Sequence, residues 1–316
     1  MKSMAIFVGI LFLVISISSN CNRQNDFSVL QGPYLGQKPP GMTPEIFAPG
    51  IISKAGFHLH SCLTFSPDGK EIYFTKMVFE PIRQGTIHYI KQEGDEWTES
   101  RIASFSGVYS DDSPAFSPDG KRLYFSSTRP TDETDETDDL NFWFVEKTDT
   151  GWSEPKYAGA VFNTDYCDFR LSISQNGTVY LSSDRVYQDN RSFDIFVSEY
   201  IDGKYTHPNI MDDAITTPIT EQIGFIAPDE SYIVFYRYPR TNPEGVGLYV
   251  SFRAKDGSWT QGKNMGDLFN SPAESCTQAA SLSPDGQYIF FLRRYDEAIY
   301  WVDAKVIEEL KPDELK

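Results

Sequence analysis

Short hydrophobic segments alternate with polar turns along most of the chain. In five places a strand-like segment ends in a turn of the Ser-Pro-Asp-Gly type, and an aromatic or β-branched segment follows. The five turn motifs are residues 65–69, 116–120, 173–177, 226–230 and 282–286. Proline presets the backbone for the second position of such a turn, and glycine accepts a positive φ at its end. Each motif therefore predicts a hairpin that joins two antiparallel strands.

Further strands are predicted after each turn. The strands that follow the turns are residues 71–75, 122–126, 179–182, 232–236 and 288–292, and the next strands are residues 86–90, 141–145, 193–197, 247–250 and 298–302. Four repeats then carry an aromatic residue after a short turn, where we expect an outer fourth strand to begin; these residues are Trp97, Trp152, Tyr205 and Trp259. The fifth repeat has no such residue, so we expect residues 44–52 to supply its outer strand.

The repeat length identifies the architecture. The Asp or Asn residues of successive turns lie 51, 57, 53 and 56 residues apart. Periods of this size, filled with strands, are typical of a β-propeller with one blade per repeat. We predict an all-β fold in which residues 44–305 form five four-stranded blades, closed by an N-terminal outer strand that leaves no sheet edge open. Residues 306–316 are predicted to be a C-terminal tail.

Composition agrees with many short strands and disfavours some partners. The chain has 316 residues, of which 40% are hydrophobic and 15% aromatic, with 22 Gly and 19 Pro. This profile argues against a helical bundle and against a disordered chain. With 28 Lys and Arg against 45 Asp and Glu, the net charge is −17. Nucleic acid and anionic membrane surfaces would repel such a molecule and are not expected partners.

The N-terminal sequence predicts export. Met1 and Lys2 precede an apolar run, residues 5–17, which has the length of a signal-peptide core and is short for a membrane span. The sequence Ser-Ser-Asn then precedes Cys21, an arrangement that resembles a bacterial lipobox although the Asn replaces the usual Gly or Ala. The alternative is an ordinary secretory signal with an incidental cysteine.

This N-terminal sequence assigns the chain to the cell envelope. Residues 1–20 are predicted to be a lipoprotein-type signal peptide, Cys21 the lipidated residue, and residues 21–43 a flexible tether of polar sequence with Pro and Gly. The expected location is the outer membrane of a Gram-negative bacterium, with the lipid anchor as the contact with the membrane.

The cysteines do not form a complete disulfide framework. Lipidation of Cys21 leaves Cys62, Cys167 and Cys276. An odd number leaves at least one thiol outside any intramolecular disulfide. We expect buried, unreactive thiols rather than nucleophiles or metal ligands.

The repeated motif carries a family resemblance. The pattern Phe-Ser-Pro-Asp-Gly-Lys-x-Leu/Ile-Tyr-Phe-Ser resembles the PD40 (WD40-like) repeat of TolB-type propellers, and it covers roughly residues 44–305. The resemblance implies a propeller fold. It implies little about activity, because similar repeats occur in envelope binding proteins, in the propellers of prolyl-oligopeptidase-like peptidases and in some polysaccharide-degrading enzymes.

One end of the predicted propeller carries the candidate binding residues. The first strand of each blade runs into the turn and the second runs back, so the start of the first and the end of the second meet at one end, which we call the top. Long connections lie there too, and binding residues favour such loops. Residues eight positions before the turn Asp or Asn are His60, Asp111, Asp168, Glu221 and Thr277, and residues just after the second strand are Lys76, Arg129, Arg185, Arg237 and Arg293.

The first of these sets forms a mostly acidic ring at the top, and the second forms a basic ring. Two interpretations of the two rings stay open. The first is structural: ion pairs between blades that orient neighbouring sheets. The second is a polar pocket at the channel mouth for a small anionic, sugar-like or peptide ligand. On the second interpretation the residues of both rings are the candidate binding residues.

Other features receive structural interpretations. The acidic residues 131–139 lack the Gly and terminal Glu of an EF-hand loop, so we expect a solvated loop. His58 and His60 have no third histidine at a comparable position, and the recurring tryptophans are expected to pack within blades. No metal or cofactor is expected.

Catalytic motifs are scarce. The sequence has no Gly-x-Ser-x-Gly elbow, no phosphate-binding Gly-rich loop and no His-Glu-x-x-His motif. We therefore expect a binding or assembly scaffold for an envelope protein, peptide or glycan, with its binding face at the top channel mouth, rather than an enzyme. The alternative is a glycan-acting hydrolase or lyase that uses Asp111, Asp168 and Glu221; a membrane-associated peptidase fragment comes third.

Overall fold

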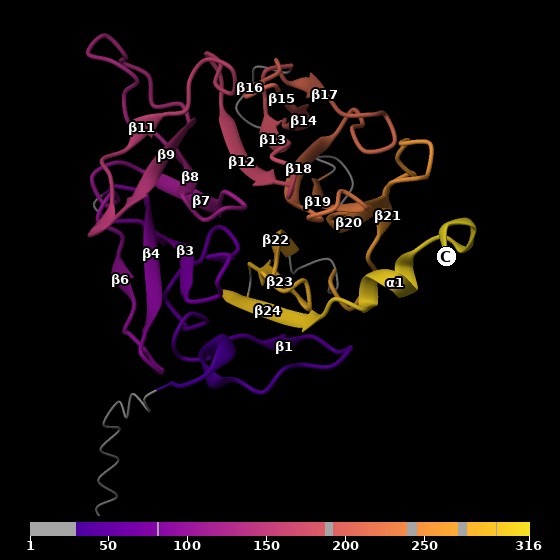
Figure 1. Ribbon diagram of the computed structural model, residues 1–316, viewed down its shortest axis with the longest axis horizontal. Helices are drawn as coiled ribbons and strands as arrows, with labels where there is room; N and C mark the ends of the chain where they lie inside the picture. The colour runs from indigo at the N-terminus through magenta and orange to yellow at the C-terminus, as the bar shows by residue number, and fades with distance from the viewer. Residues whose placement is uncertain (1–29, 81, 187–191, 239–244, 271–276, 295) are drawn as a thin grey trace, which may run out of the picture.

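Five antiparallel sheets form a ring around a central axis (Figure 1). The computed structural model describes residues 30–80, 82–186, 192–238, 245–270, 277–294 and 296–316. The prediction of an all-β, five-bladed propeller with four-stranded blades is confirmed. The predicted signal peptide, Cys21 and Cys276 lie outside the described residues. Within the described part of the chain, no helix has the length and apolar character needed to span a membrane.

The blades follow one another along the chain. Blade 1 contains β2 (Thr64–Phe65), β3 (Glu71–Val78), β4 (Gln84–Glu93), β5 (Glu96–Trp97) and β6 (Arg101–Ile102). Blade 2 contains β7 (Asp111–Phe116), β8 (Arg122–Ser127), β9 (Asn141–Thr148), β10 (Gly151–Trp152) and β11 (Lys156–Tyr157). Blade 3 contains β12 (Asp168–Ile173), β13 (Val179–Ser183), β14 (Asp194–Ser198) and β17 (Asn209–Ile210), with a separate hairpin of β15 (Tyr200–Ile201) and β16 (Lys204–Tyr205). Blade 4 contains β18 (Thr220–Ile226), β19 (Tyr232–Tyr238), β20 (Gly247–Phe252) and β21 (Lys263–Asn264). Blade 5 contains β22 (Thr277–Leu282), β23 (Tyr288–Arg293), β24 (Ala298–Asp303) and, from the other end of the domain, β1 (Glu45–Ile46).

The ring closes as the sequence predicts. Glu45 and Ile46 of β1 lie opposite Trp301 and Tyr300 of β24, and Figure 1 shows indigo β1 alongside yellow β24. Phe47, which follows β1, is fully buried and packs on the ring of Trp301 at 5.1 Å between centroids. Pairing the first strand with the last blade gives that blade its fourth strand and joins the two ends of the domain.

Residues 30–43 do not form the flexible tether that the sequence predicts. The Trp97 indole donates to the Gly32 carbonyl at 2.8 Å, and Leu35 is buried. The Tyr34 ring contacts Phe65 of blade 1 and Tyr288 of blade 5. The physical reason is that the seam between these two blades exposes aromatic side chains, which this segment covers. Only residues 21–29 of the predicted tether lie outside the described part.

The outer strands begin later than predicted. Trp97 and Trp152 each close a short hairpin with the third strand of their own blade, and the longer-range outer pairing starts four residues further on, at Arg101 and Lys156. Trp97 is buried, and the Trp152 ring packs on Tyr73 of blade 1. These two tryptophans serve blade packing, as expected.

A β-bulge interrupts the inner strand of four blades at matching positions, and it shapes the central channel. Register shifts occur in β7, β12, β18 and β22. Three bulge residues, Ser113, Arg170 and Ala279, have φ values between 47° and 56°. A bulge redirects the side chains that follow it, so the lower half of each inner strand presents a new face to the channel.

The tail after the last blade is packed as well. Helix α1 (Val306–Leu310) buries Val306 and Ile307 in the core that blades 4 and 5 share. The tail therefore covers one edge of the propeller.

Candidate functional site

Three of the predicted acids pair with three of the predicted arginines inside single blades. The pairs are Arg129–Asp111 at 3.2 Å, Arg185–Asp168 at 2.9 Å and Arg237–Glu221 at 3.0 Å. In each pair the acid is the first or second residue of the first strand, and the arginine lies within two residues of the end of the second strand of the same sheet. The three carboxylates are fully buried, and the arginine side chains are at most 14% exposed. The structural interpretation is thus supported, but the pairs lie within blades and not between them.

Each arginine also holds the connection that enters its blade. Guanidinium groups donate to the carbonyls of Phe105, Phe162, Ile215 and Leu268, at 2.7 to 3.0 Å. The acids accept from the same connections: Ser106 donates to Asp111 and Thr164 donates to Asp168. Buried polar groups require such partners, so the rings fix the path of the chain from one blade to the next.

Burial dominates the ionisation of these acids. It raises the pKa of Asp111 and of Asp168, against the lowering effects of Arg129 and Arg185. Burial also raises the pKa of Glu221 to about 7, with hydrogen bonds from Thr217 and the charge of Arg237 opposing it. A fourth buried acid, Asp194 at the start of β14, was not singled out in the sequence, and burial alone raises its pKa to about 6.

Blade 5 keeps half of the pattern. Thr277 stands where the other blades carry an acid, and its hydroxyl donates to the Phe269 carbonyl at 2.6 Å. Arg293 donates to the neighbouring Leu268 carbonyl at 2.7 Å. The same connection is held without a carboxylate.

Blade 1 departs further from the pattern. His60 stands at the acid position and contacts Asp112 of blade 2 through its Nδ1 atom, so this contact does link two blades. Burial by itself would raise the pKa of Asp112, but the charge and hydrogen bond of His60, with help from Arg170, lower it to about 2. Lys76 stands at the arginine position and lies over the ring of Phe57 at 3.6 Å from the centroid. Burial and the charge of Lys54 lower the pKa of Lys76 to about 8.

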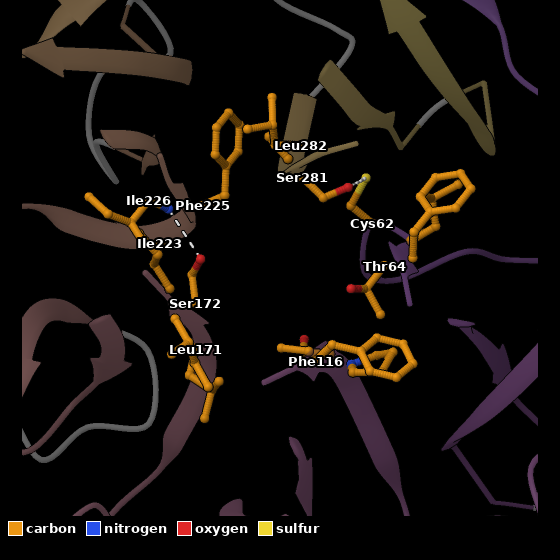
Figure 2. A pocket seen from close by; sticks show the side chains of 18 of the residues that line it. Cys62, Thr64, Phe116, Leu171, Ser172, Ile223, Phe225, Ile226, Ser281 and Leu282 are labelled. Atoms are coloured by element: carbon orange, nitrogen blue, oxygen red, sulfur yellow. Dashed lines mark hydrogen bonds between the residues drawn. The ribbon is translucent and has the colours of Figure 1, made fainter. Parts of the chain in front are cut away.

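A cavity of about 360 Å³ lies in the central channel. Its walls come from the inner strands of all five blades, and it extends down to the prolines of the turns, Pro67, Pro118, Pro228 and Pro284. Figure 2 shows Cys62, Thr64, Phe116, Leu171, Ser172, Ile223, Phe225, Ile226, Ser281 and Leu282 around this space. All five blades therefore form the cavity together, and no single blade forms it alone.

Hydroxyl groups and apolar side chains share the cavity wall. Ser172 accepts from the Ile226 amide at 3.1 Å, and Ser281 contacts the Cys62 thiol at 3.4 Å, so neighbouring blades are bonded to one another along the channel (Figure 2). Arg170 is the one charged side chain among the described residues that line the cavity. Its guanidinium lies 4.9 Å from the ring centroid of Phe169.

None of the ten ring residues is among the described residues that line the cavity. The binding residues named from the sequence lie at the top of the blades, while the cavity lies along the lower part of the inner strands.

A sequence signal for Arg170 does exist. Six positions before the turn Asp or Asn the other repeats carry Cys62, Ser113, Ile223 and Ala279, so an arginine at this position is the exception.

The other candidate features stay structural. Burial raises the pKa of the Cys62 thiol to about 11 and that of Cys167 to about 12, so both thiols are protonated at neutral pH, as expected. Within the described ranges, no three His, Cys, Asp or Glu side chains are grouped so as to hold a metal ion. The acidic residues 131–139 form a mostly exposed loop.

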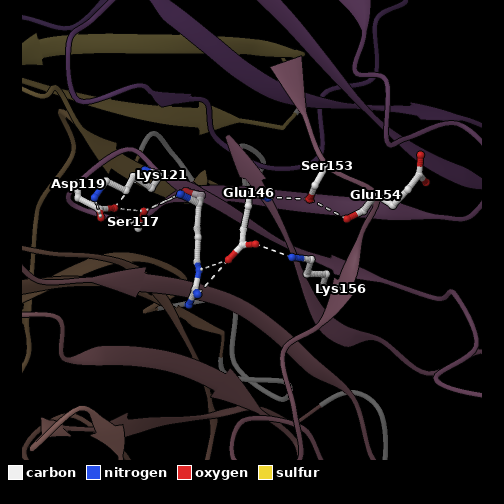
Figure 3. Close-up of polar contacts among 8 residues, drawn as sticks. Ser117, Asp119, Lys121, Glu146, Ser153, Glu154 and Lys156 are labelled. Atoms are coloured by element: carbon white, nitrogen blue, oxygen red, sulfur yellow. Dashed lines mark hydrogen bonds and ion pairs between the residues drawn. The ribbon is translucent and has the colours of Figure 1, made fainter. Parts of the chain in front are cut away.

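A separate set of ion pairs lies on the outer surface of blade 2 (Figure 3). Glu146 of β9 lies between two cations, with Arg122 at 3.0 Å and Lys156 at 2.5 Å. These side chains are between 35% and 52% exposed. They are far more accessible to water than the rings at the top.

Comparisons with known proteins support the fold and show little else about this protein. No family profile and no curated protein matches the chain. Similar solved structures include TolB from Acinetobacter baumannii, with 16% identity and a TM-score of 0.45 over 77% of this chain and 53% of that one. They also include a putative TolB from Agrobacterium tumefaciens, with 17% identity and a TM-score of 0.47 over 73% of this chain and 68% of that one.

The chain thus spans about half the length of the Acinetobacter protein. Its own strand pairing makes it a five-bladed β-propeller, and the repeated turn-and-strand motif of its sequence resembles that of TolB-type propellers.

Proposed function

We propose that this protein is a lipid-anchored scaffold of the cell envelope that binds a ligand in its central channel. The observation that carries the proposal is the cavity of about 360 Å³, walled by five inner strands, with Arg170 as the charged residue of its described wall. Ligand pockets range upward from about 300 Å³ and combine apolar walls with a few convergent polar groups, which this cavity also does.

The cavity chemistry indicates the class of ligand. Arg170 favours an anionic group such as a carboxylate, because it brings a positive charge to the cavity wall. The hydroxyls of Ser61, Ser113 and Ser281 suit the hydroxyls of a sugar or the amides of a peptide. A sugar acid or the carboxyl terminus of a peptide fits this combination, with the apolar side chains of the wall covering the rest of the molecule.

The envelope location rests on the N-terminal sequence. The apolar run 5–17 and the lipobox-like residues before Cys21 support export and lipidation. Replacing Cys21 by Ala tests this part: we expect the wild-type protein to incorporate a palmitate analogue and to fractionate with membranes, and the C21A protein to do neither. Equal labelling of both proteins would show that Cys21 is not the lipidated residue.

The alternative of a glycan-acting enzyme at the top carboxylates finds less support. Asp111, Asp168 and Glu221 are fully buried, and each is bonded to an arginine and to the connection before it. A catalytic pair needs one carboxylate to reach the substrate and unequal environments for its two members. Here the repeat gives the three acids nearly the same surroundings.

Calorimetric titration tests channel binding. The purified protein is titrated with glucuronate and glucose, and with a hydrophobic tripeptide in its free and its C-terminally amidated forms. We expect binding of the acidic member of at least one pair, and a loss of at least tenfold in affinity in R170Q. The matched control is R122Q on the outer surface of blade 2, which should bind as the wild type does.

Two results would contradict the proposal. One is equal affinity of R170Q and R122Q for every probe, with both proteins folded by circular dichroism. The other is equal binding of the acidic and the neutral probes, because Arg170 would then have no part in recognition.

A further inference from the structure

Lys76, near the end of β3 at the top of blade 1, has surroundings that differ from those of the arginines at the same repeat position. Among the described residues, no carboxylate forms an ion pair with it. Side chains two positions apart on a strand lie on the same face, so Lys76 shares a face with Phe74. Its Nζ atom lies 3.6 Å from the ring centroid of Phe57 and 5.4 Å from that of Phe74. The amine is therefore held against two apolar rings.

A second lysine approaches one of these rings. The Phe57 amide donates to the Lys54 carbonyl at 3.0 Å, and this turn places Lys54 Nζ 5.2 Å from the Phe57 ring centroid. Glu297 of blade 5 fixes the turn, because it accepts from the Gly56 amide at 3.0 Å and pairs with His58 at 2.5 Å. Two ammonium groups therefore lie around one phenyl ring, and the carboxylate that faces this turn is bonded to His58.

A hydroxyl and an imidazole complete the cluster around Lys76. Lys76 Nζ donates to Ser100 Oγ at 3.5 Å, and Ser100 Oγ lies 3.4 Å from His88 Nδ1. The His88 ring stacks on Phe74, with 6.0 Å between the ring centroids. Burial and the charge of Lys76 lower the pKa of His88 to about 4, so its imidazole is neutral at pH 7. His88 therefore orients the hydroxyl without adding a charge.

These surroundings favour an uncharged, reactive amine. Burial and the charge of Lys54 lower the pKa of Lys76 to about 8, so roughly a fifth of it is uncharged at pH 7.4, against about 0.1% of an ordinary lysine. Desolvation and a neighbouring cation are two ways in which proteins activate lysine as a nucleophile. Lys54 is exposed, and Lys76 and Phe57 are partly exposed, so small molecules can reach the cluster from water.

From this cluster we propose that Lys76 is a nucleophilic amine that forms an imine with an aldehyde carrying an anionic group, and that Lys54 binds the anionic group. The inference goes beyond the proposed function, because neither lysine is among the described residues that line the channel cavity. The nearby positive charge of Lys54 selects an anionic molecule over a neutral one. The open-chain form of a sugar acid is one compound that carries both groups.

The bond changes balance without a further reactant. The lone pair of the uncharged Lys76 Nζ forms a bond to the aldehyde carbon, and the π electrons of the carbonyl move to its oxygen. That oxygen takes up one proton as the nitrogen gives one up. The hydroxyl then leaves as water with a second proton from the nitrogen, and the nitrogen lone pair forms the C=N bond. One amine and one aldehyde give one imine and one water, so no atom is oxidised or reduced.

Reductive trapping tests the proposal on the wild-type protein. The protein is incubated at pH 7.4 with glyoxylate, which is anionic, or with glycolaldehyde, which is neutral, in the presence of cyanoborohydride. Peptide mass spectrometry then measures the trapping rate at each lysine. Lys121 is the internal comparison, because its side chain is 81% exposed and accessibility alone would favour it. We expect glyoxylate to be trapped at Lys76 at least tenfold faster than at Lys121.

Matched variants test the part played by Lys54. We expect K54Q to lower the ratio of the glyoxylate rate to the glycolaldehyde rate at Lys76 at least fivefold, because the anion loses its partner. The control is K255Q, which removes an exposed lysine from blade 4 and should leave the ratio within twofold of the wild type. A pulse of trinitrobenzenesulfonate at a series of pH values measures the protonation of Lys76 separately, and its reaction should reach half of its maximum near pH 8.

Three outcomes would overturn the inference. Equal trapping at Lys76 and Lys121 would show that Lys76 is an ordinary surface amine. A half-maximum for Lys76 at the pH found for Lys121 would show the same without any aldehyde. An unchanged ratio in K54Q would remove the anionic group from the proposal. Trapping at Lys76 should be the same in R170Q as in the wild type, so this inference and the proposed channel function fail separately.

Discussion

Two arginine–carboxylate pairs of nearly equal length have different surroundings in this molecule. Arg185 and Asp168 lie 2.9 Å apart at the top of blade 3, and the side chains are 12% and 0% exposed. Arg122 and Glu146 lie 3.0 Å apart on the outer surface of blade 2, and the side chains are 44% and 35% exposed. The distance alone therefore says nothing about what each pair contributes.

Burial decides the difference. Water and salt screen the outer pair, and its partners lose side-chain entropy when they meet. The inner pair is protected from water, and its members also bond to the connection that enters the blade. Removing one member of a buried pair leaves an uncompensated charge, whereas removing one member of an exposed pair leaves a hydrated one.

The largest effect is expected from breaking the inner pair. R185Q leaves Asp168 buried without its cation, and we expect it to lower the free energy of unfolding by about 3–5 kcal/mol. Urea denaturation at pH 7 measures the change. The double variant D168N/R185Q should recover part of the loss because the buried charge is gone. A loss in R185Q below about 1 kcal/mol would place the inner pair in the same class as the outer one.

A smaller effect of opposite sign is expected at Asp194, a buried acid that forms no ion pair with any cation in the described part of the chain. Burial raises its pKa in the folded state to about 6, from an ordinary value of 3.8. The folded state then binds more protons than the unfolded state between these values, so stability falls as the pH rises from 4 to 6. D194N should therefore stabilise the protein by up to about 3 kcal/mol at pH 8 and have little effect at pH 4. An equal gain at both pH values would show that ionisation is not the cause.

The link between blades 1 and 2 should give an intermediate loss. H60A removes the partner of Asp112, and because both side chains are mostly buried we expect a loss of about 1–3 kcal/mol. Chemical denaturation at pH 7 measures it. H60Q, which can still donate a hydrogen bond, should lose less than H60A. Equal losses in the two variants would show that packing, and not the contact with Asp112, is what His60 provides.

The smallest effect is expected on the outer surface. R122Q should change the free energy of unfolding by less than about 1 kcal/mol, and the change should shrink further in 1 M salt. Thermal and urea unfolding at low and high salt measure both quantities. A loss as large as that of R185Q, insensitive to salt, would contradict the role assigned to burial.

Much of the fold could be predicted because its signals are local. The turn after each inner strand and the aromatic strand that follows it occur within about a dozen residues, and the repeat of this unit predicts the number of blades. The closure by residues near 45 followed from a missing strand in the fifth repeat, and β1 confirms it. The outer strands were placed four residues too early, because Trp97 and Trp152 end hairpins that the hydrophobic pattern does not separate from the strands after them.

The candidate site could be predicted only in part. The repeat positions correctly predict that Asp111, Asp168 and Glu221 lie next to the arginines near the ends of the second strands. Whether these residues lie in water or in the interior depends on the connections that cover them, and no repeat pattern reports that. Arg170 was missed because the strand pattern treats it as one more inner-strand residue, while the bulge at this position turns it toward the cavity.

The sequence by itself determined the class of fold, the number and order of the blades, the closing strand and the surplus of acidic charge, because each of these depends on neighbouring residues or on simple counts. Only the tertiary structure decided which charges are buried, that residues 30–43 cover the seam between the first and last blades, and that five separate strands enclose one cavity. These properties require side chains from repeats more than 50 residues apart to meet, and they exist only when the ring is closed.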